Sequence, residues 1–337
     1  MNILKRDLVR ITMCIESEGN MNNIANTILD KYQIRKTSKQ KNAFIELVES
    51  YARTKGYACR VEKGMMGARN IIVGDPDKAN VVYTAHYDTC PKLPFPNFIT
   101  PKKFSLYLLY QLAITLGAFI LAFAMGFIGG LIGAVIGNVV CISEELVDSI
   151  TNVIVFVMIY GLLFLLVAGP ANKHTANDNT SGVVTLLEIM RKMPDDKLER
   201  AAFVFFDLEE SGLFGSAGYA SKHKNQKSNK LLVNFDCVSD GDHILFAVRK
   251  GAKTYRSLLE KHFISNEDFK VEILDKGVFY PSDQMNFSCG VGVAALKYSK
   301  RLKTLYMDRI HTKRDVIFDE RNIEFLSDRA VNMACDE

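Results

Sequence analysis

The stretch VVYTAHYD, residues 81–88, carries no charged side chain before its histidine and ends in an aspartate. Its first five residues offer no charge on either face, which is typical of a central strand covered by helices on both sides. The run FVFF at 203–206 has the same character, and the acidic segment DLEE follows it at 207–210. Because open α/β sheets bind ligands beyond the carboxyl ends of their strands, the polar residues after these two strands are the first candidates for a site.

Strand-like and helix-like segments alternate along the rest of the soluble sequence. This alternation predicts an α/β fold with a mixed, mostly parallel sheet covered by helices. The predicted strands are residues 70–73, 81–85, 202–207, 231–235, 244–248 and 292–296. The predicted helices are residues 40–54, 181–192, 214–221, 254–262 and 322–334.

Two long uncharged runs interrupt this pattern. Residues 104–142 contain no Asp, Glu, Lys or Arg, and a second such run covers 149–172. A helix needs about 20 apolar residues to cross the hydrocarbon core of a membrane, and helices of soluble proteins rarely run longer. The sequence therefore predicts a transmembrane helical hairpin at 99–172. This insertion divides the α/β domain into a first part, 1–98, and a second part, 173–337.

The charges around the hairpin indicate its orientation. Lys102, Lys103 and Lys173 flank the two runs, whereas the link between them, SEELVD at 143–148, is acidic. Lysine and arginine mark the cytoplasmic side of short loops, so both soluble parts are predicted to face the cytoplasm. The first run is longer than one crossing requires. Because both soluble parts contribute residues to one site, as described below, the number of crossings must be even. Two crossings are predicted, and the extra length of the first run is interpreted as a tilted extension or a re-entrant piece.

Glycines recur every four residues in the first run, as at Gly126 and Gly130 and at Gly129 and Gly133. This spacing lets helix backbones approach closely. Packing of the two hairpin helices against each other is the favoured interpretation, although the same glycines would also suit a homo-oligomer.

The composition excludes several classes of protein. The net charge is +4 and no Lys/Arg block dominates, so nothing indicates a nucleic-acid partner. The seven cysteines are scattered singly without a C-x-x-C pair, which argues against a disulfide framework and for a reducing compartment. Residues 1–10, MNILKRDLVR, lack the apolar core of a secretory signal. An integral membrane protein with a cytoplasmic domain is predicted.

Five polar segments stand at or near the ends of predicted elements. They are His86-Tyr87-Asp88, NDNTSG at 177–182, DLEESG at 207–212, Asp236, and Ile310-His311-Thr312. Each has an ordinary explanation alone, because a lone histidine is often a hydrogen-bonded core residue and Asp178 could cap a helix. Together, two histidines and several carboxylates match the nitrogen and oxygen ligands of zinc.

The ordered set H-x-D, N-D-N-x-S-G, E-E-S-G-x-x-G-S, a strand-ending Asp and I-H-T resembles the M28 family of zinc peptidases. The resemblance covers residues 40–337, with 91–172 set aside as an insertion. It implies a zinc-exopeptidase-like fold and a two-zinc exopeptidase, most simply an aminopeptidase acting on peptides. Manganese or cobalt could also occupy such a nitrogen and oxygen site.

The resemblance also implies a role for each matching residue. The implied metal ligands are His86 and Asp236 for one ion, Glu210 and His311 for the other, and Asp178 as a bridge with one carboxylate oxygen for each. Glu209 would act as general base, and Asp88 would orient His86 by accepting its other ring N–H.

Some residues depart from the family pattern or lie outside it. Gln284 stands where soluble relatives often have a histidine that is not a ligand, which predicts changed substrate contacts. Tyr280 is interpreted as a pocket wall in preference to a residue that stabilises the reaction intermediate. Cys90 and Cys237 lie near Asp88 and Asp236, and small buried cysteines are the more common outcome.

Several alternatives stay open at the level of sequence. A carboxypeptidase or a cyclase could use the same scaffold, although the resemblance implies only one zinc for the cyclases. A non-catalytic membrane scaffold is disfavoured because every expected position is filled. The apolar runs adjoin Asp88 and Asp178 in sequence, so the site either opens toward the bilayer, favouring hydrophobic or membrane-derived peptides, or is merely tethered there.

Overall fold

The computed structural model describes residues 21–140 and 143–336. They form two compact units, one of Met1–Lys103 with Ala171–Glu337 and one of Phe104–Pro170. We refer to these as the catalytic unit and the hairpin unit. The prediction that residues 1–10 are no secretory signal lies outside the described residues.

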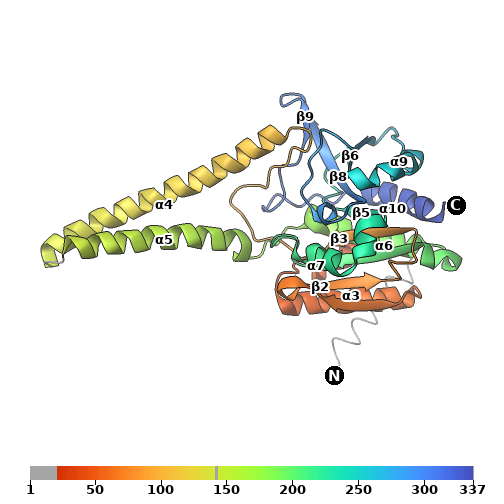
Figure 1. The fold of residues 1–337 in the computed structure, drawn as a ribbon, viewed down its shortest axis with the longest axis horizontal. Helices are drawn as coiled ribbons and strands as arrows, with labels where there is room; N and C mark the ends of the chain where they lie inside the picture. The colour runs from red at the N-terminus through yellow and green to blue at the C-terminus, as the bar shows by residue number, and fades with distance from the viewer. Residues whose placement is uncertain (1–20, 141–142, 337) are drawn as a thin grey trace, which may run out of the picture. The chain divides into compact units, whose positions relative to one another are not determined.

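A nine-stranded mixed sheet forms the centre of the catalytic unit, in the order β1-β2-β4-β3-β5-β8-β6-β7, with β9 paired to β8 (Figure 1). Its strands are β1 Cys59–Lys63, β2 Arg69–Val73, β3 Val81–His86, β4 Ala201–Phe206, β5 Leu232–Phe235, β6 His243–Val248, β7 Lys270–Leu274, β8 Gly290–Ser299 and β9 Thr304–Tyr306. The four central strands β4, β3, β5 and β8 are parallel. On either side of them, β2 pairs antiparallel with β4 and β6 pairs antiparallel with β8. The predicted α/β fold with a mixed sheet is confirmed, and β1, β7 and β9 are additional strands.

Helices cover both faces of this sheet. They are α2 Met21–Lys31, α3 Ser38–Thr54, α6 Gly182–Lys192, α7 Phe214–Lys222, α8 Lys224–Asn229, α9 Arg256–His262 and α10 Glu320–Cys335. Alternate residues of β3 belong to the hydrophobic cores on opposite faces of the sheet. Tyr83 lies in the core with the α6 side chains, and Val82 lies in the core with Tyr219 of α7. Burial on both faces explains why the strand sequences are apolar without alternation.

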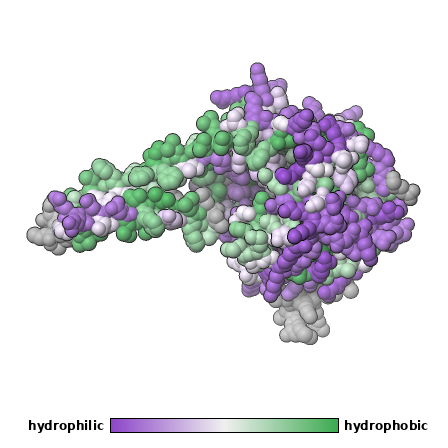
Figure 2. All heavy atoms as spheres, viewed as in Figure 1, coloured by the Kyte–Doolittle hydropathy of each residue, from purple (hydrophilic) through white to green (hydrophobic). Residues whose placement is uncertain are grey.

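The hairpin unit consists of two helices, α4 Phe104–Val140 and α5 Glu144–Ala168. Phe104–Ile136 and Glu144–Leu165 are long and apolar enough to cross a membrane, by length and composition. Large apolar side chains such as Leu109, Phe127 and Phe164 point outward, and Figure 2 colours much of both helices as hydrophobic. The described part of the first run is one continuous helix of 37 residues, which favours the tilted extension over the re-entrant piece.

Gly126, Gly129, Gly130 and Gly133 of α4 face α5, which supports their role in packing within the hairpin. A Cβ atom at Gly126 would lie 2.0 Å from Cγ2 of Val155, and one at Gly130 would lie 2.9 Å from Oγ1 of Thr151. Gly117 of the same helix has no atom within 4 Å of such a Cβ. The two helix backbones therefore approach each other along one glycine face only.

Replacing Gly126 with valine is expected to destabilise the hairpin by about 1–3 kcal/mol, because the added side chain must displace Val155 or the backbone. Thermal unfolding of the detergent-solubilised protein, followed by far-ultraviolet circular dichroism, should show an earlier loss of helix. Gly117→Val is the matched control and should unfold like the parent. Equal unfolding of both variants would contradict the packing role of this face.

Candidate metal centre

The carboxyl ends of three neighbouring parallel strands meet at one edge of the sheet. β3 lies between β4 and β5, so the chain passes from β3 to β4 on one side and then across to β5 on the other. His86 ends β3, Glu209 and Glu210 follow β4, and Asp236 follows β5. Loops that leave such a reversal point diverge, and the opening between them is where open α/β sheets bind ligands.

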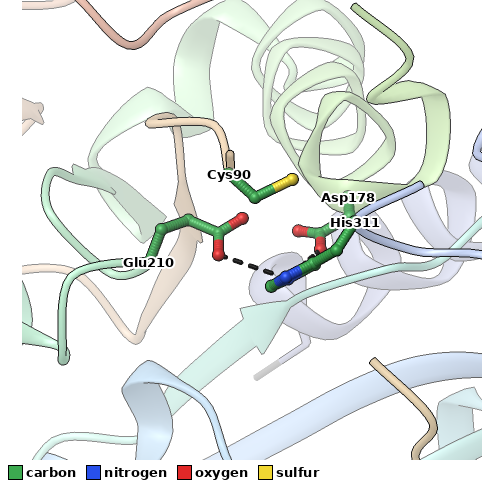
Figure 3. A group of neighbouring side chains, drawn as sticks. All are labelled: Cys90, Asp178, Glu210 and His311. Atoms are coloured by element: carbon green, nitrogen blue, oxygen red, sulfur yellow. Dashed lines mark ion pairs between the residues drawn. The ribbon is translucent and has the colours of Figure 1, made fainter. Parts of the chain in front are cut away.

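The side chains at this edge form two halves that share Asp178. In the His86 half, Nε2 of His86 lies 3.3 Å from Oδ1 of Asp178 and 3.5 Å from Oδ1 of Asp236. In the His311 half, shown in Figure 3, Nε2 of His311 lies 3.1 Å from Oδ2 of Asp178 and 3.3 Å from Oε2 of Glu210. Each oxygen of Asp178 thus faces a different histidine.

These separations fit metal ions in both halves. Nitrogen and oxygen ligands about 2.0–2.1 Å from a tetrahedral zinc ion stand roughly 3.3 Å apart, the length of a tetrahedron edge. A direct hydrogen bond between histidine and carboxylate is shorter, about 2.7–2.9 Å. Oε1 of Glu210 is also buried without a hydrogen-bond partner among the described residues. Buried carboxylates of this kind require a cation to offset their desolvation, so the donor set fits divalent metals.

Asp178 lies in a short π-helical turn, Ala176–Ser181, that precedes α6. The carboxylate of Asp315 accepts the backbone N–H groups of Asn177 and Asp178 at 2.7 and 3.0 Å. Gly182 packs directly on β5, since a Cβ there would lie 2.3 Å from the carbonyl oxygen of Phe235. Ser181, not Asp178, occupies the N-cap position of α6, so the ordinary explanation of Asp178 as a helix cap is wrong.

The electrostatics around Asp178 depend on its two histidines. Burial alone would raise the pKa of Asp178, but contacts with His311 and His86 outweigh it and lower that pKa below its usual value. Burial, together with the nearby charge of Asp178, raises the pKa of Asp315 to about 8. Asp315 was not among the predicted site residues. It stands three positions after the I-H-T motif, and only its hydrogen bonds in the folded chain identify it as part of the site.

Asp88 holds the loop that follows β4. Its carboxylate accepts the backbone N–H groups of Glu209 and Glu210 at 3.0 and 3.3 Å. Nδ1 of His86 lies 3.1 Å from the backbone carbonyl oxygen of Asp88 and 3.6 Å from its carboxylate. The carbonyl is therefore the nearer acceptor for the histidine ring, and the carboxylate mainly orients the two glutamates.

Several residues around the site have left-handed backbone conformations. The φ angles are 55° at Leu208, 58° at Cys237 and 65° at His311. Non-glycine residues rarely adopt this region, and such strain collects at functional sites, where surrounding contacts enforce it. The backbone is thus held in a costly form at the loops after β4 and β5 and at the His311 segment.

Glu209 lies on the His86 side, where its carboxylate is within 4.8 Å of ligand atoms of His86 and Asp236. Burial raises the pKa of Glu209 well above its usual value; His86 opposes this rise, and Glu210 and Asp283 add to it. Asp283, the neighbour of Gln284 in the sequence, was not among the predicted site residues. It is fully buried, and neither of its carboxylate oxygens has a hydrogen-bond partner within the described chain. Burial raises the pKa of Asp283 to about 7.

Gln284 and Tyr280 support the site from behind. The Gln284 side-chain amide donates to the carbonyl of Tyr280 at 2.7 Å and accepts from Asn234 at 3.2 Å. The Tyr280 hydroxyl donates to the backbone carbonyl of Asp236 at 3.0 Å. Gln284 is buried and its side chain is committed to the interior, and the expected change in substrate contacts at this position stays a prediction.

The sequence reasoning missed Arg35, which lies in the loop between α2 and α3. Its fully buried guanidinium donates to the carbonyls of Tyr87 and Tyr32 and to the Thr180 hydroxyl. Burial lowers the pKa of Arg35 to about 10, a shift that the charges of Asp88 and Asp178 oppose. Arg35 therefore joins the loop after β3 to the turn that carries Asp178. No motif surrounds it, so the sequence offers no signal for this role.

Replacing Arg35 with methionine is expected to lower the free energy of unfolding by about 3 kcal/mol, because several buried acceptors lose their donor. Chemical denaturation of the metal-free protein in detergent measures this change. Arg53→Met on α3 is the control, since the Arg53 side chain is 71% exposed and should contribute little. A similar loss in both variants would contradict the joining role of Arg35.

The comparisons with known proteins agree with this fold. None of the curated protein sequences matches the chain. The LapA aminopeptidase of Legionella pneumophila has a TM-score of 0.51 at 13% identity, covering 98% of this chain and 74% of that one. A Zn-dependent exopeptidase from Parabacteroides distasonis has a TM-score of 0.56 at 13% identity, covering 95% and 98%. The glutaminyl cyclase of Porphyromonas gingivalis has a TM-score of 0.54 at 14% identity, covering 93% and 96%.

At these identities the solved structures show a shared fold. The family assignment comes from the sequence profile described as Peptidase family M28, which matches residues 150–331. His86 and Asp88 precede that segment and reach the site through the pairing of β3 with β4 and β5. Because the matched segment spans more than half of the chain, the protein belongs to peptidase family M28 and is a hydrolase of the zinc peptidase type.

Proposed function

We propose that the protein is a membrane-anchored, two-zinc aminopeptidase. The observation that carries this proposal is the position of Asp178 between the two half-sites. One of its carboxylate oxygens lies 3.3 Å from His86, and the other lies 3.1 Å from His311. One carboxylate shared between two histidine and carboxylate half-sites is what a pair of closely spaced cations requires. When bound, zinc supplies a positive charge that polarises the scissile carbonyl and makes water more acidic.

The residues of the chain divide the remaining work. His86, Asp236 and Asp178 would hold one ion, and Glu210 and His311 would hold the other together with Asp178. Glu209 accepts the proton of the attacking water at its carboxylate and returns it to the leaving amine. Asp88 fixes the backbone that carries Glu209 and Glu210 by accepting both of their N–H groups. A carboxylate held near other negative charges has a raised pKa, and this rise suits Glu209 to carry a proton.

The choice of an aminopeptidase rests on the acidic character of the site. The buried Asp283 lies within electrostatic reach of the partly buried Glu209, and neither Asp283 oxygen has a hydrogen-bond partner within the described residues. Unpaired carboxylates favour a substrate ammonium group over a carboxylate, because the former offsets their desolvation and the latter adds repulsion. The cyclase alternative implies one zinc, whereas both half-sites here have a histidine and carboxylates.

Mass-spectrometric product analysis with a peptide library tests the reaction. The zinc-loaded protein in detergent is incubated with peptides of which half have blocked N-termini. Loss of single residues from free N-termini only supports the aminopeptidase. Trimming of blocked peptides from the other end would assign a carboxypeptidase, and N-terminal ring closure of glutamine peptides would assign a cyclase. No product from any peptide, despite bound zinc, would favour the scaffold alternative.

We also propose that α4 and α5 cross the bilayer with the catalytic unit in the cytoplasm. The outward apolar side chains of both helices and the acidic link at 143–148 support this orientation. Both flanking lysines have partners within their own unit. Lys102 forms an ion pair with Glu272 at 2.6 Å, and Lys103 donates to the Leu302 carbonyl at 2.8 Å. Cysteines introduced by Glu145→Cys and Lys224→Cys test the topology. In intact cells, an impermeant maleimide should label the first only; labelling of the second alone would reverse the orientation.

The segments that lead into and out of the hairpin contact the His311 segment. The Leu93 N–H donates to the His311 carbonyl at 2.8 Å, and the Asn172 side-chain amide donates to the Thr312 carbonyl at 3.1 Å. This placement supports the proposal that the enzyme takes hydrophobic or membrane-derived peptides. In liposomes, a lipid-anchored peptide should be cleaved faster than its soluble counterpart, and equal rates would favour simple tethering.

A further inference from the structure

The thiol of Cys90 is a nucleophilic group that the proposed reaction leaves unused. Cys90 is buried in the segment after β3. Its Sγ atom lies within 4.8 Å of ligand atoms of Asp178, Glu210 and His311. Figure 3 shows these four side chains converging from separate segments of the chain. The sulfur therefore belongs to the His311 half of the site.

Glu210 independently marks a cation position in the same half. Its Oε2 atom lies 3.3 Å from Nε2 of His311, and its side chain is only 7% exposed. The second oxygen, Oε1, has no hydrogen-bond partner in the described parts of the chain. A buried carboxylate oxygen without a donor is costly unless a cation lies against it. The carboxylate with the unpaired oxygen and the thiol thus belong to one group of candidate ligands.

The backbone holds Cys90 and His311 in a common framework. The Cys90 carbonyl accepts the N–H of Asn172 at 3.1 Å, and Pro91 and Ala171 form an antiparallel bridge. The side chain of Asn172 then reaches the Thr312 carbonyl, next to His311. These contacts fix Cys90 to the segment that carries His311. Such outer contacts hold a metal ligand in place.

Cys237, the second thiol near the site, differs in its contacts. Its Sγ atom lies near Asp178 and Asp236 without a histidine in the group. The thiol donates to Oδ1 of Asp236 at 3.2 Å. It therefore acts as a hydrogen-bond donor to a carboxylate, and it supplies an internal comparison for Cys90.

From this geometry we propose that Cys90 is a thiolate ligand of the metal ion held by Glu210 and His311, which rests on the proposed two-metal site. When the metal binds, the S–H bond breaks, the sulfur keeps the electron pair and the proton passes to the solvent. The sulfur makes this half-site softer than a site of nitrogen and oxygen alone. It therefore favours Zn²⁺ and Cd²⁺ over Mn²⁺.

Cobalt substitution tests this role without an activity measurement. The full chain in detergent is stripped of metal, kept in a thiol-free reductant and titrated with Co²⁺. A sulfur-to-cobalt charge-transfer band is expected in the parent, in Cys237→Ser and in Cys289→Ser. Cys289 is the matched control because its buried thiol contacts the carbonyls of Ser228 and Gly251. The band should be lost in Cys90→Ser and Cys90→Ala, and the preference for Cd²⁺ over Mn²⁺ should fall by about tenfold or more.

The outcomes separate the ligand role from the two-metal proposal. Two bound cobalt ions without a sulfur band in the parent overturn the role of Cys90 and leave the two-metal site standing. A band that survives in both Cys90 variants, or that disappears only in Cys237→Ser, also overturns it. A single bound ion overturns the two-metal site, and the band still decides whether Cys90 binds that ion. No bound cobalt overturns both.

Discussion

Glu209→Gln is expected to lower kcat by about 10²–10⁴-fold while the protein keeps both metal ions. Glutamine has nearly the same shape as glutamate, but its amide cannot accept a proton from water, which removes general base catalysis. KM should change little, because the substrate contacts remain. Single-turnover and steady-state assays on the best peptide from the library measure kcat, and elemental analysis of desalted protein measures metal content.

The same substitution should not destabilise the metal-free protein. Burial and the neighbouring carboxylates of Glu210 and Asp283 raise the pKa of Glu209, so the charge of this residue is unfavourable without metal. Thermal unfolding should therefore be unchanged or shifted upward. Glu267→Gln, at an exposed position before β7, is the control and should retain full activity. A variant that loses one metal ion would instead identify Glu209 as a ligand and overturn its assignment as base.

The sheet was the most predictable part of the fold. Residues 81–85 and 202–206 could be assigned as central strands because burial on both faces leaves few alternatives to β-branched and aromatic side chains. β1 was missed because its pattern mixes charges with small residues: it lies at the sheet edge, where the sequence CRVEK has no apolar face to display. β7, KVEIL, also lies at an edge; Val271 and Ile273 pack against the core, but the charged residues beside them interrupt the apolar pattern.

The site residues that share a motif could be named from the sequence, and those that reach the site from segments without a motif could not. His86, Asp178 and His311 are recognisable because spacing and neighbouring residues repeat a known order. Arg35 and Asp315 bind backbone groups of those motifs from distant segments, and any sequence position could in principle supply such a contact. Cys90 was interpreted as an ordinary buried thiol, since only the fold brings its sulfur beside Glu210 and His311.

Asp178→Asn is expected to reduce metal binding in both half-sites, whereas Asp236→Asn should reduce it in one. The asparagine side chain keeps a single acceptor oxygen and presents an N–H₂ group to one of the histidines that Asp178 now contacts at 3.1 and 3.3 Å. It also removes the negative charge that two nearby cations share. Loss of a residue that only supports a ligand costs about 10–100-fold in metal affinity, so loss of the bridge should exceed this for each ion.

Elemental analysis of desalted protein and calorimetric zinc titration distinguish the two variants. Asp236→Asn should retain one tight site, because His311, Glu210 and the second oxygen of Asp178 stay in place. Asp195→Asn, at an exposed position beyond the opposite end of α6 from Asp178, should bind zinc like the parent. If Asp236→Asn lost both ions and Asp178→Asn kept one, the shared carboxylate would be Asp236. Retention of both ions by Asp178→Asn would mean that the two half-sites bind independently, and the bridging arrangement on which the two-zinc reaction depends would be wrong.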